Sequence, residues 1–265
     1  MYSRSTSAFK YFNYYRTASN GKGHGIHSPF IFKFVTEVLN DKTDYGDYSK
    51  AEGLRKQMLN NRTVLEVEDF GAGSSVSKTN KRTIASIAKN AAKPKKYGQL
   101  LYRITKKYQS KTILELGTSL GITTSYLSLA KQDAKIITLE GSSAIANKAK
   151  ENFGTLELKN IELIEGNFDN TLSSVLNGIP TIDLAFIDGN HRQEPTEKYF
   201  HQLLPHFSND SILIFDDIHW SREMEAAWET IKANEAVRCS IDLFFIGIVF
   251  FRQEFKEKQH FMIRF

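Results

Sequence analysis

The sequence predicts an α/β protein in which most strands run parallel. From Gly98 onward, short apolar strand patterns alternate with helical patterns at regular spacing. The strand-like stretches are 112–116, 135–140, 161–165, 182–187 and 211–215. Strands that follow one another through helices pair in parallel, so we expect a sheet with helices on both faces.

Composition limits the class of protein. Of the 265 residues, 41% are hydrophobic and 25% are charged, which fits a globular core with an appendage. The single cysteine, Cys239, excludes an internal disulfide and suits a reducing compartment. The N-terminus has no unbroken apolar stretch typical of a secretory signal, and the longest apolar run, 243–251, is too short to cross a bilayer as a helix. We therefore expect a cytoplasmic protein without a membrane partner.

One stretch, 112–130, has the pattern of strand, tight turn and helix. The turn contains Gly117 and Gly121, and Glu115 lies near the strand end. Glycines let a ligand approach the backbone, and a helix N-terminus supplies N–H donors and partial positive charge. The next strand ends at Glu140, where a nucleotide-like site needs a carboxylate for two ribose hydroxyls. We infer that the turn and Glu140 bind a nucleotide-like ligand. The alternatives are that the turn is an ordinary strand-to-helix connection and that Glu140 is a solvated acid at a strand end.

The same turn also spells G-x-S-x-G, the nucleophile elbow of serine hydrolases. Ser119 would be the nucleophile, with Asp188 and His219 following in triad order. An elbow normally follows several strands, whereas the residues before Ser119 are poor in strand pattern. His219 also precedes two further strand-like segments, so we favour the cofactor site.

At this turn the chain resembles the class I S-adenosylmethionine-dependent methyltransferases, most closely the catechol and caffeoyl-coenzyme A type O-methyltransferases. The motif E-L-G-x-x-x-G runs from Glu115 to Gly121, and Ser119 replaces the central glycine of the wider superfamily, as in this subgroup. The resemblance covers roughly 97–265. It implies a Rossmann-like, seven-stranded, mostly parallel sheet closed by a C-terminal antiparallel strand pair, whose phenylalanines we place in the core.

The resemblance also implies how S-adenosylmethionine would bind. The cofactor would lie across the turn with Glu140 on the ribose. Asn167 and Phe168 occupy the position that contacts the adenine in the family; the alternative is a turn with one core aromatic. The predicted cofactor residues are Glu115, Gly117, Thr118, Ser119, Gly121, Glu140, Gly141, Asn167, Phe168 and Asp188.

Catalytic and metal-binding residues follow from the same comparison. In the family, the aspartate matching Asp188 binds a divalent metal and a lysine three residues later acts as base. Here that later residue is His191, whose neutral imidazole can accept a hydroxyl proton. The family's remaining ligands are an acid and an amide, where this chain has Asp216 and Asp217. We predict His191 and Asp188 as catalytic residues, and Mg²⁺ or another divalent ion on Asp188, Asp216 and Asp217. In the alternative, Asp217 caps the helix starting near Ser221.

The N-terminal part differs in character. We predict a helical, aromatic and basic extension at 1–97 that covers the substrate, and a Rossmann-like methyltransferase domain at 98–265. One helix should begin with Ser28 as N-cap and run to about Leu39.

A second glycine-containing loop lies at 67–74. No strand ending in an acid follows it to bind a ribose, so we interpret it as a turn into a helix near 83–89, with Asp69 facing the substrate.

A basic segment, 78–111, lies within an acid-free stretch from residue 74 to residue 114. Its lysines and arginines give +11, against +5 for the whole chain. Such a segment is a candidate surface for nucleic acid or acidic substrates. We favour a solvated helix face, because no recognised nucleic-acid module accompanies it.

The predicted function is S-adenosylmethionine-dependent O-methylation of a small hydroxylated acceptor. One alternative is methylation of RNA or another acidic macromolecule through the basic 78–111 segment. Another is a non-catalytic module that holds the cofactor, which the absence of the family lysine leaves open. Homodimer formation is left open as well.

Overall fold

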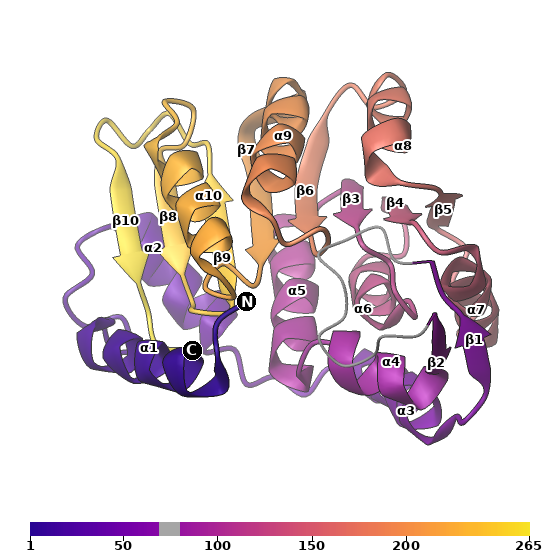
Figure 1. Ribbon diagram of the computed structural model, residues 1–265. Coiled ribbons are helices and arrows are strands. Elements are labelled where there is room, and N and C mark those ends of the chain that lie inside the picture. Colours follow the sequence, from indigo (N-terminus) through magenta and orange to yellow (C-terminus); the bar gives the residue numbers. More distant parts are fainter. Residues whose placement is uncertain (69–79) are drawn as a thin grey trace. The chain divides into compact units, whose positions relative to one another are not determined.

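The computed structural model describes residues 1–68 and 80–265 (Figure 1). The chain divides into two compact units: unit 1 comprises 1–41 and 179–265, and unit 2 comprises 42–178. The predicted division near residue 97 stays a prediction. Asp69, most of the 67–74 loop and the first basic residue, Lys78, lie outside the described residues.

Unit 2 contains three parallel strands in the order β3–β4–β5 and a small antiparallel pair, β1–β2. Its helices and strands are α3 (Asp47–Asn60), β1 (Val64–Glu66), β2 (Lys81–Thr83), α4 (Ile84–Ala91), α5 (Lys95–Tyr108), β3 (Thr112–Leu116), α6 (Ile122–Ala130), β4 (Lys135–Glu140), α7 (Ser143–Thr155), β5 (Ile161–Glu165) and α8 (Phe168–Leu176).

The core of unit 2 forms around aromatic residues of its helices. Tyr126 of α6 is fully buried and packs with Tyr48 of α3, which also contacts Tyr102 of α5. Gly98 allows α5 to approach α6, because a Cβ there would lie 2.5 Å from the Tyr126 ring. The packing holds α6, and with it the predicted cofactor turn, against the parallel strands.

Unit 1 contains five strands in the order β10–β8–β9–β7–β6. Its elements are α1 (Arg4–Thr17), α2 (Pro29–Phe34), the π-helical turn η1 (Val35–Leu39), β6 (Ile182–Ile187), α9 (Gln193–Leu203), the 3₁₀ turn η2 (Leu204–His206), β7 (Phe207–Asp216), α10 (Arg222–Ala233), β8 (Cys239–Asp242), β9 (Ile246–Phe250) and β10 (Gln259–Met262). β6 and β7 pair in parallel, and β9 runs antiparallel to both β7 and β8.

The α/β class and the C-terminal antiparallel pair are confirmed, but the strand number is not. Among the described residues, the set β3–β4–β5 and the set β10–β8–β9–β7–β6 together hold eight strands, where seven were predicted. The extra strand is β10, which pairs in parallel with β8. The Arg238 side chain donates to the carbonyls of Phe255 and Lys256, and Gln259 N donates to Arg238 O at 3.0 Å. These bonds hold the returning chain beside β8.

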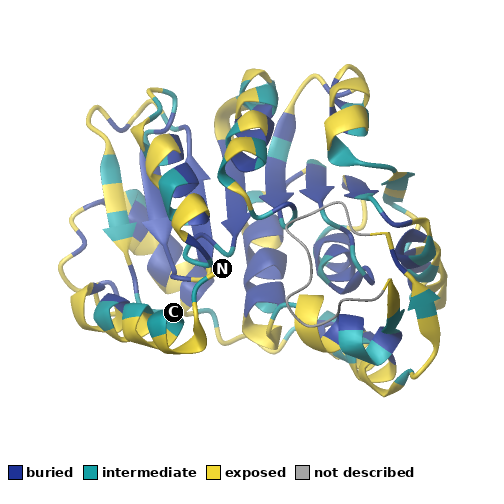
Figure 2. Cartoon of the chain, viewed as in Figure 1, coloured by how far each residue is buried: buried dark blue, intermediate teal, exposed yellow. Residues whose placement is uncertain are grey.

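Burial follows this order of strands. Figure 2 shows β8 and β9 buried along their length, whereas β10 alternates between half-buried and exposed residues. On the side of β10 away from β8, Ser19 forms a parallel bridge with Ile263: Ser19 N donates to Met262 O at 2.8 Å, and Arg264 N donates to Ser19 O at 3.0 Å. One phenylalanine predicted in the core, Phe245, is instead 41% exposed.

Local helix signals are largely confirmed. The Ser28 hydroxyl accepts from Ile31 N at the start of α2, and the helical path ends at Leu39 as predicted. Thr83 caps α4 in the same way, which confirms the helix predicted near 83–89; strand β2 directly precedes it, and most of the predicted turn lies outside the described residues. Among the helices of the described ranges, none combines the length and apolarity needed to cross a bilayer.

Candidate functional site

The predicted cofactor turn connects β3 to α6 in unit 2. Gly117 and Gly121 have φ values of 106° and 76°. A Cβ at Gly121 would overlap the Phe153 ring, so only glycine fits there. Ser119 also lies in the left-handed region, at φ 48°, which costs a residue with a Cβ roughly 1–2 kcal/mol. A side chain held in this conformation indicates that the surrounding structure fixes the turn.

Glu140 provides that fixation. Ser119 N donates to Glu140 Oε2 at 2.8 Å, and Ser142 N donates to Oε1 at 3.0 Å. The carboxylate therefore joins the turn after β3 to the turn after β4, where Gly141 lies between Glu140 and Ser142. The half-buried, doubly bonded carboxylate is not the freely solvated acid of the alternative interpretation.

Glu115 lies inside unit 2. It is fully buried, and its Oε2 accepts from the hydroxyls of Thr124 at 2.5 Å and Thr138 at 2.6 Å. The Thr138 hydroxyl also lies 2.6 Å from that of Thr118. Glu115 thus ties β3 to α6 and β4, and its contact with a ligand stays a prediction.

The backbone of the turn is occupied by its own hydrogen bonds. The N–H groups of Gly117 and Thr118 both donate to Leu139 O, and Gly121 N donates to Thr118 O. With the Ser119 bond to Glu140, these N–H groups hold the shape of the turn. Sequence reasoning expected the turn to offer N–H donors to a ligand and did not anticipate this internal bonding.

The carboxyl end of β5 also lies beside Glu140. Gly166 N donates to Glu140 O at 2.9 Å, so the loop after β5 meets the end of β4. Asn167 caps α8, because its side chain accepts from Asp169 N at 3.0 Å. Phe168 is half-buried rather than a core aromatic. The structure therefore brings Ser119, Glu140 and the start of α8 together through hydrogen bonds.

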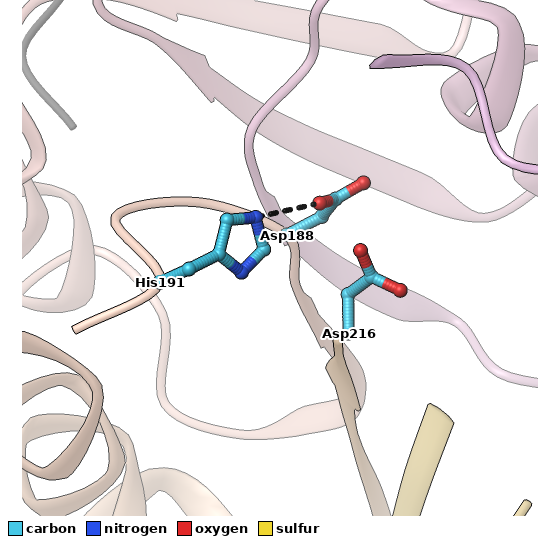
Figure 3. A group of neighbouring side chains, drawn as sticks. All are labelled: Asp188, His191 and Asp216. Carbon is cyan, nitrogen blue, oxygen red and sulfur yellow. Dashed lines mark ion pairs between the residues drawn. The ribbon is translucent and has the colours of Figure 1, made fainter. Parts of the chain in front are cut away.

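In unit 1, a second group forms at the ends of β6 and β7: Asp188, His191 and Asp216 (Figure 3). His191 Nε2 lies 3.5 Å from Asp188 Oδ1, and one candidate ligand atom from each residue lies within 4.8 Å of the others. Asp216 is 1% exposed, while Asp188 and His191 are half-buried. Two carboxylates and an imidazole in this arrangement could hold a divalent cation.

Asp217, predicted as a metal ligand, does not join this group. Its backbone has φ 52°, and its N–H donates to Phe245 O at 2.7 Å. Its role as a metal ligand stays a prediction, whereas the capping alternative is wrong, because the N-cap of α10 is Ser221, whose hydroxyl accepts from Met224 N. His191 takes the third place in the cluster.

The loop that carries His191 is held by Asn190. This residue has φ 57°, its amide donates to the Tyr199 hydroxyl at 3.0 Å, and its Oδ1 accepts from Arg192 Nε at 2.9 Å. The Trp220 ring lies 5.7 Å from that of His191. Sequence reasoning missed both neighbours; an asparagine directly after Asp188 and Gly189 is the available signal, since asparagine tolerates positive φ.

His219 is committed elsewhere. Its Nδ1 lies 3.0 Å from Glu225 and its Nε2 lies 2.8 Å from Asp242. Burial alone lowers the pKa of His219, but hydrogen bonds to Asp242 and Glu225 and their charges raise it overall. With both ring nitrogens on carboxylates, neither accepts a proton from a serine, so the hydrolase alternative loses its base.

The described part of the basic 78–111 segment is spread over β2, α4 and α5. Arg103 is buried, and Lys106 lies over the rings of Tyr45 and Tyr102. Burial also lowers the pKa of Lys96. Nucleic-acid binding through this segment stays a prediction.

Comparison with known proteins agrees with the predicted class. Residues 114–218 match the family model of a methyltransferase domain, a range that contains the cofactor turn, Glu140, Asp188 and Asp216. This range resembles a methyltransferase domain, and solved methyltransferase structures share the fold predicted from the sequence.

Solved structures of methyltransferases have a similar fold. The methyltransferase PaMTH1 of Podospora anserina, solved with S-adenosylhomocysteine, aligns with 95% of this chain and 97% of its own at a TM-score of 0.59 and 13% identity. An O-methyltransferase from Bacillus cereus, also bound to S-adenosylhomocysteine, aligns with 83% of this chain and 97% of its own at a TM-score of 0.57 and 18% identity. These structures share the fold.

A short part of the chain is similar to a tRNA methyltransferase. A tRNA (guanine-N(7)-)-methyltransferase of Mycoplasma mobile is 37% identical over 82 residues, which is 31% of this chain. The match spans only 41% of that relative's length.

Proposed function

We propose that this protein transfers the methyl group of S-adenosylmethionine to a hydroxyl group of a small acceptor. The observation that carries the proposal is the carboxylate of Glu140, fixed between two turns by Ser119 N and Ser142 N. Each carboxylate oxygen can accept more than one hydrogen bond, so the bonds to Ser119 N and Ser142 N are compatible with bonds to ribose hydroxyls. The glycines at 117 and 121 supply space beside the backbone, and bound S-adenosylmethionine supplies the electrophilic methyl group.

His191 is the proposed base. An imidazole that donates from Nε2 toward Asp188 keeps Nδ1 as the acceptor of the hydroxyl proton. Asp188 would then hold the tautomer and stabilise the imidazolium that forms. Asn190 fixes the loop, so the ring is positioned before the acceptor arrives.

A divalent cation is the second proposal for the same cluster. Asp188, His191 and Asp216 offer two carboxylates and one imidazole, a mixed set that suits Mn²⁺, Co²⁺ or Zn²⁺ better than Mg²⁺, which prefers oxygen. A bound cation would acidify the acceptor hydroxyl. The nitrogen that binds a cation cannot also take the proton, so the two roles of His191 can be separated experimentally.

Methyl transfer from labelled S-adenosylmethionine to a panel of catechols, phenols and aliphatic alcohols tests the function. The panel should be run with chelator, with Mg²⁺ and with Mn²⁺. Transfer to a hydroxylated small molecule supports the proposal. Transfer to RNA alone would instead favour the acceptor class of the Mycoplasma mobile relative.

A further inference from the structure

Helix α1 turns aromatic side chains outward, and Figure 2 shows much of its surface exposed. Phe9 and Phe12 are 65% and 57% exposed. At about 100° per residue, Tyr11, Phe12, Tyr15 and Phe9 fall within an arc of about 160°. The ring of Phe245 lies 6.0 Å from that of Tyr11 and extends the patch. These five residues are called the aromatic face.

The orientation of α1 is fixed from its other side. Lys10 Nζ donates to both carboxylate oxygens of Glu225, at 2.9 and 3.0 Å, and the Tyr2 hydroxyl donates to the same carboxylate at 2.6 Å. Tyr14 is buried with its ring 5.2 Å from Phe244. The helix therefore docks through Lys10 and Tyr14 and leaves Phe9 and Phe12 outward, where an ordinary surface helix carries polar residues.

Two arginines flank the aromatic face. Residues 1–36 contain five lysines and arginines and no acid. Arg16 lies 5.9 Å from the Phe12 ring centre, and Arg264 lies 4.5 Å from that of Tyr15. Exposed rings flanked by cations complement a layer of anionic lipid headgroups, where rings enter the acyl boundary and cations meet phosphates.

Other occupants fit less well. A twofold dimer through this face would bring Arg16 and Arg264 toward their own copies without an acid to pair them. Nucleic-acid bases stack on open ring faces, whereas the rings of Phe12 and Tyr15 each carry an arginine.

We propose that the aromatic face docks this protein on an anionic lipid surface, with α1 lying parallel to the surface. The absence of a spanning segment, from which no membrane partner was expected, concerns crossing a bilayer and not binding to its surface. The inference is independent of the methyl acceptor.

Sedimentation of the full chain with lipid vesicles tests the proposal. We expect binding to vesicles containing about one third phosphatidylglycerol and little binding to pure phosphatidylcholine, with a marked loss in about 0.5 M salt. Phe9→Ser combined with Phe12→Ser should weaken binding about tenfold or more without lowering the melting temperature, because both rings are exposed. The matched control is Phe32→Ser combined with Leu59→Ser. These two side chains lie outside α1 and are 45% and 43% exposed, so the control variant should bind vesicles like wild type.

A second variant reports insertion directly. The tryptophan fluorescence of Phe12→Trp should shift to the blue when anionic vesicles are added, and brominated lipids should quench it. Wild type, which has two tryptophans of its own, provides the reference for both changes. Equal binding by wild type and the double serine variant, or no preference for anionic lipid, would overturn the proposal. Two other results would also overturn it. One is a wild-type dimer that the double serine variant dissociates, with no vesicle binding by wild type. The other is single-stranded RNA binding that the double serine variant loses, again with no vesicle binding by wild type.

Discussion

Replacing Glu140 with alanine tests the geometry of the cofactor turn most directly. Hydrogen bonds to a charged acceptor contribute about 1.5–3 kcal/mol, so loss of the carboxylate should weaken S-adenosylhomocysteine binding about 10- to 150-fold. The same change leaves Ser119 N and Ser142 N without their acceptor. Because Glu140 is only half-buried, we expect a cost of about 1–2 kcal/mol and a drop in melting temperature of roughly 2–6 °C.

Calorimetric titration with S-adenosylhomocysteine measures the affinity, and thermal unfolding measures the cost to the fold. Glu140→Gln keeps one carbonyl oxygen and should fall between alanine and wild type. Glu165→Ala is the matched control: Glu165 pairs with Glu140 across β4 and β5, but its carboxylate contacts Lys150. A folded Glu140→Ala protein that binds with wild-type affinity would refute the assignment, whatever its melting temperature.

Three further predictions concern other groups. His191→Gln should lower turnover by roughly 10²–10⁴-fold with cofactor affinity nearly unchanged if histidine is the base; if Mn²⁺ raises the wild-type melting temperature and His191→Gln abolishes that shift, histidine is a ligand instead. The pKa of His219 is raised in the folded state, so its contribution to stability is present below about pH 6.5 and is lost as pH rises through the higher folded pKa; unfolding titrations should show this loss in wild type and not in His219→Gln. RNA binding should be weak and steeply salt-dependent, and charge reversal at Lys95 and Lys96 should flatten that dependence; micromolar affinity surviving about 0.2 M salt would contradict this.

Features set by local chemistry were predictable from the sequence. The cap at Ser28 depends on its own hydroxyl and the following proline, and the parallel strands depend on apolar periodicity. Features set by tertiary contacts were not. Asp217 is not part of the group of Asp188, His191 and Asp216, and its backbone turns to bond Phe245. β10 pairs in parallel because Arg238 holds the returning chain. Glu140 combines both kinds of feature. Its position at the strand end was predicted, whereas its hydrogen bond to Ser119, whose backbone is left-handed, was not.

The bridge between Ser19 and Ile263 has a consequence for solubility. A strand at a sheet border presents unpaired N–H and C=O groups that can recruit strands from other molecules. Here the segment after α1 occupies the outer hydrogen-bonding positions of Met262 and Arg264. The end of the edge strand β10 is thus covered by the chain's own N-terminal region, which protects the protein there against edge-to-edge association.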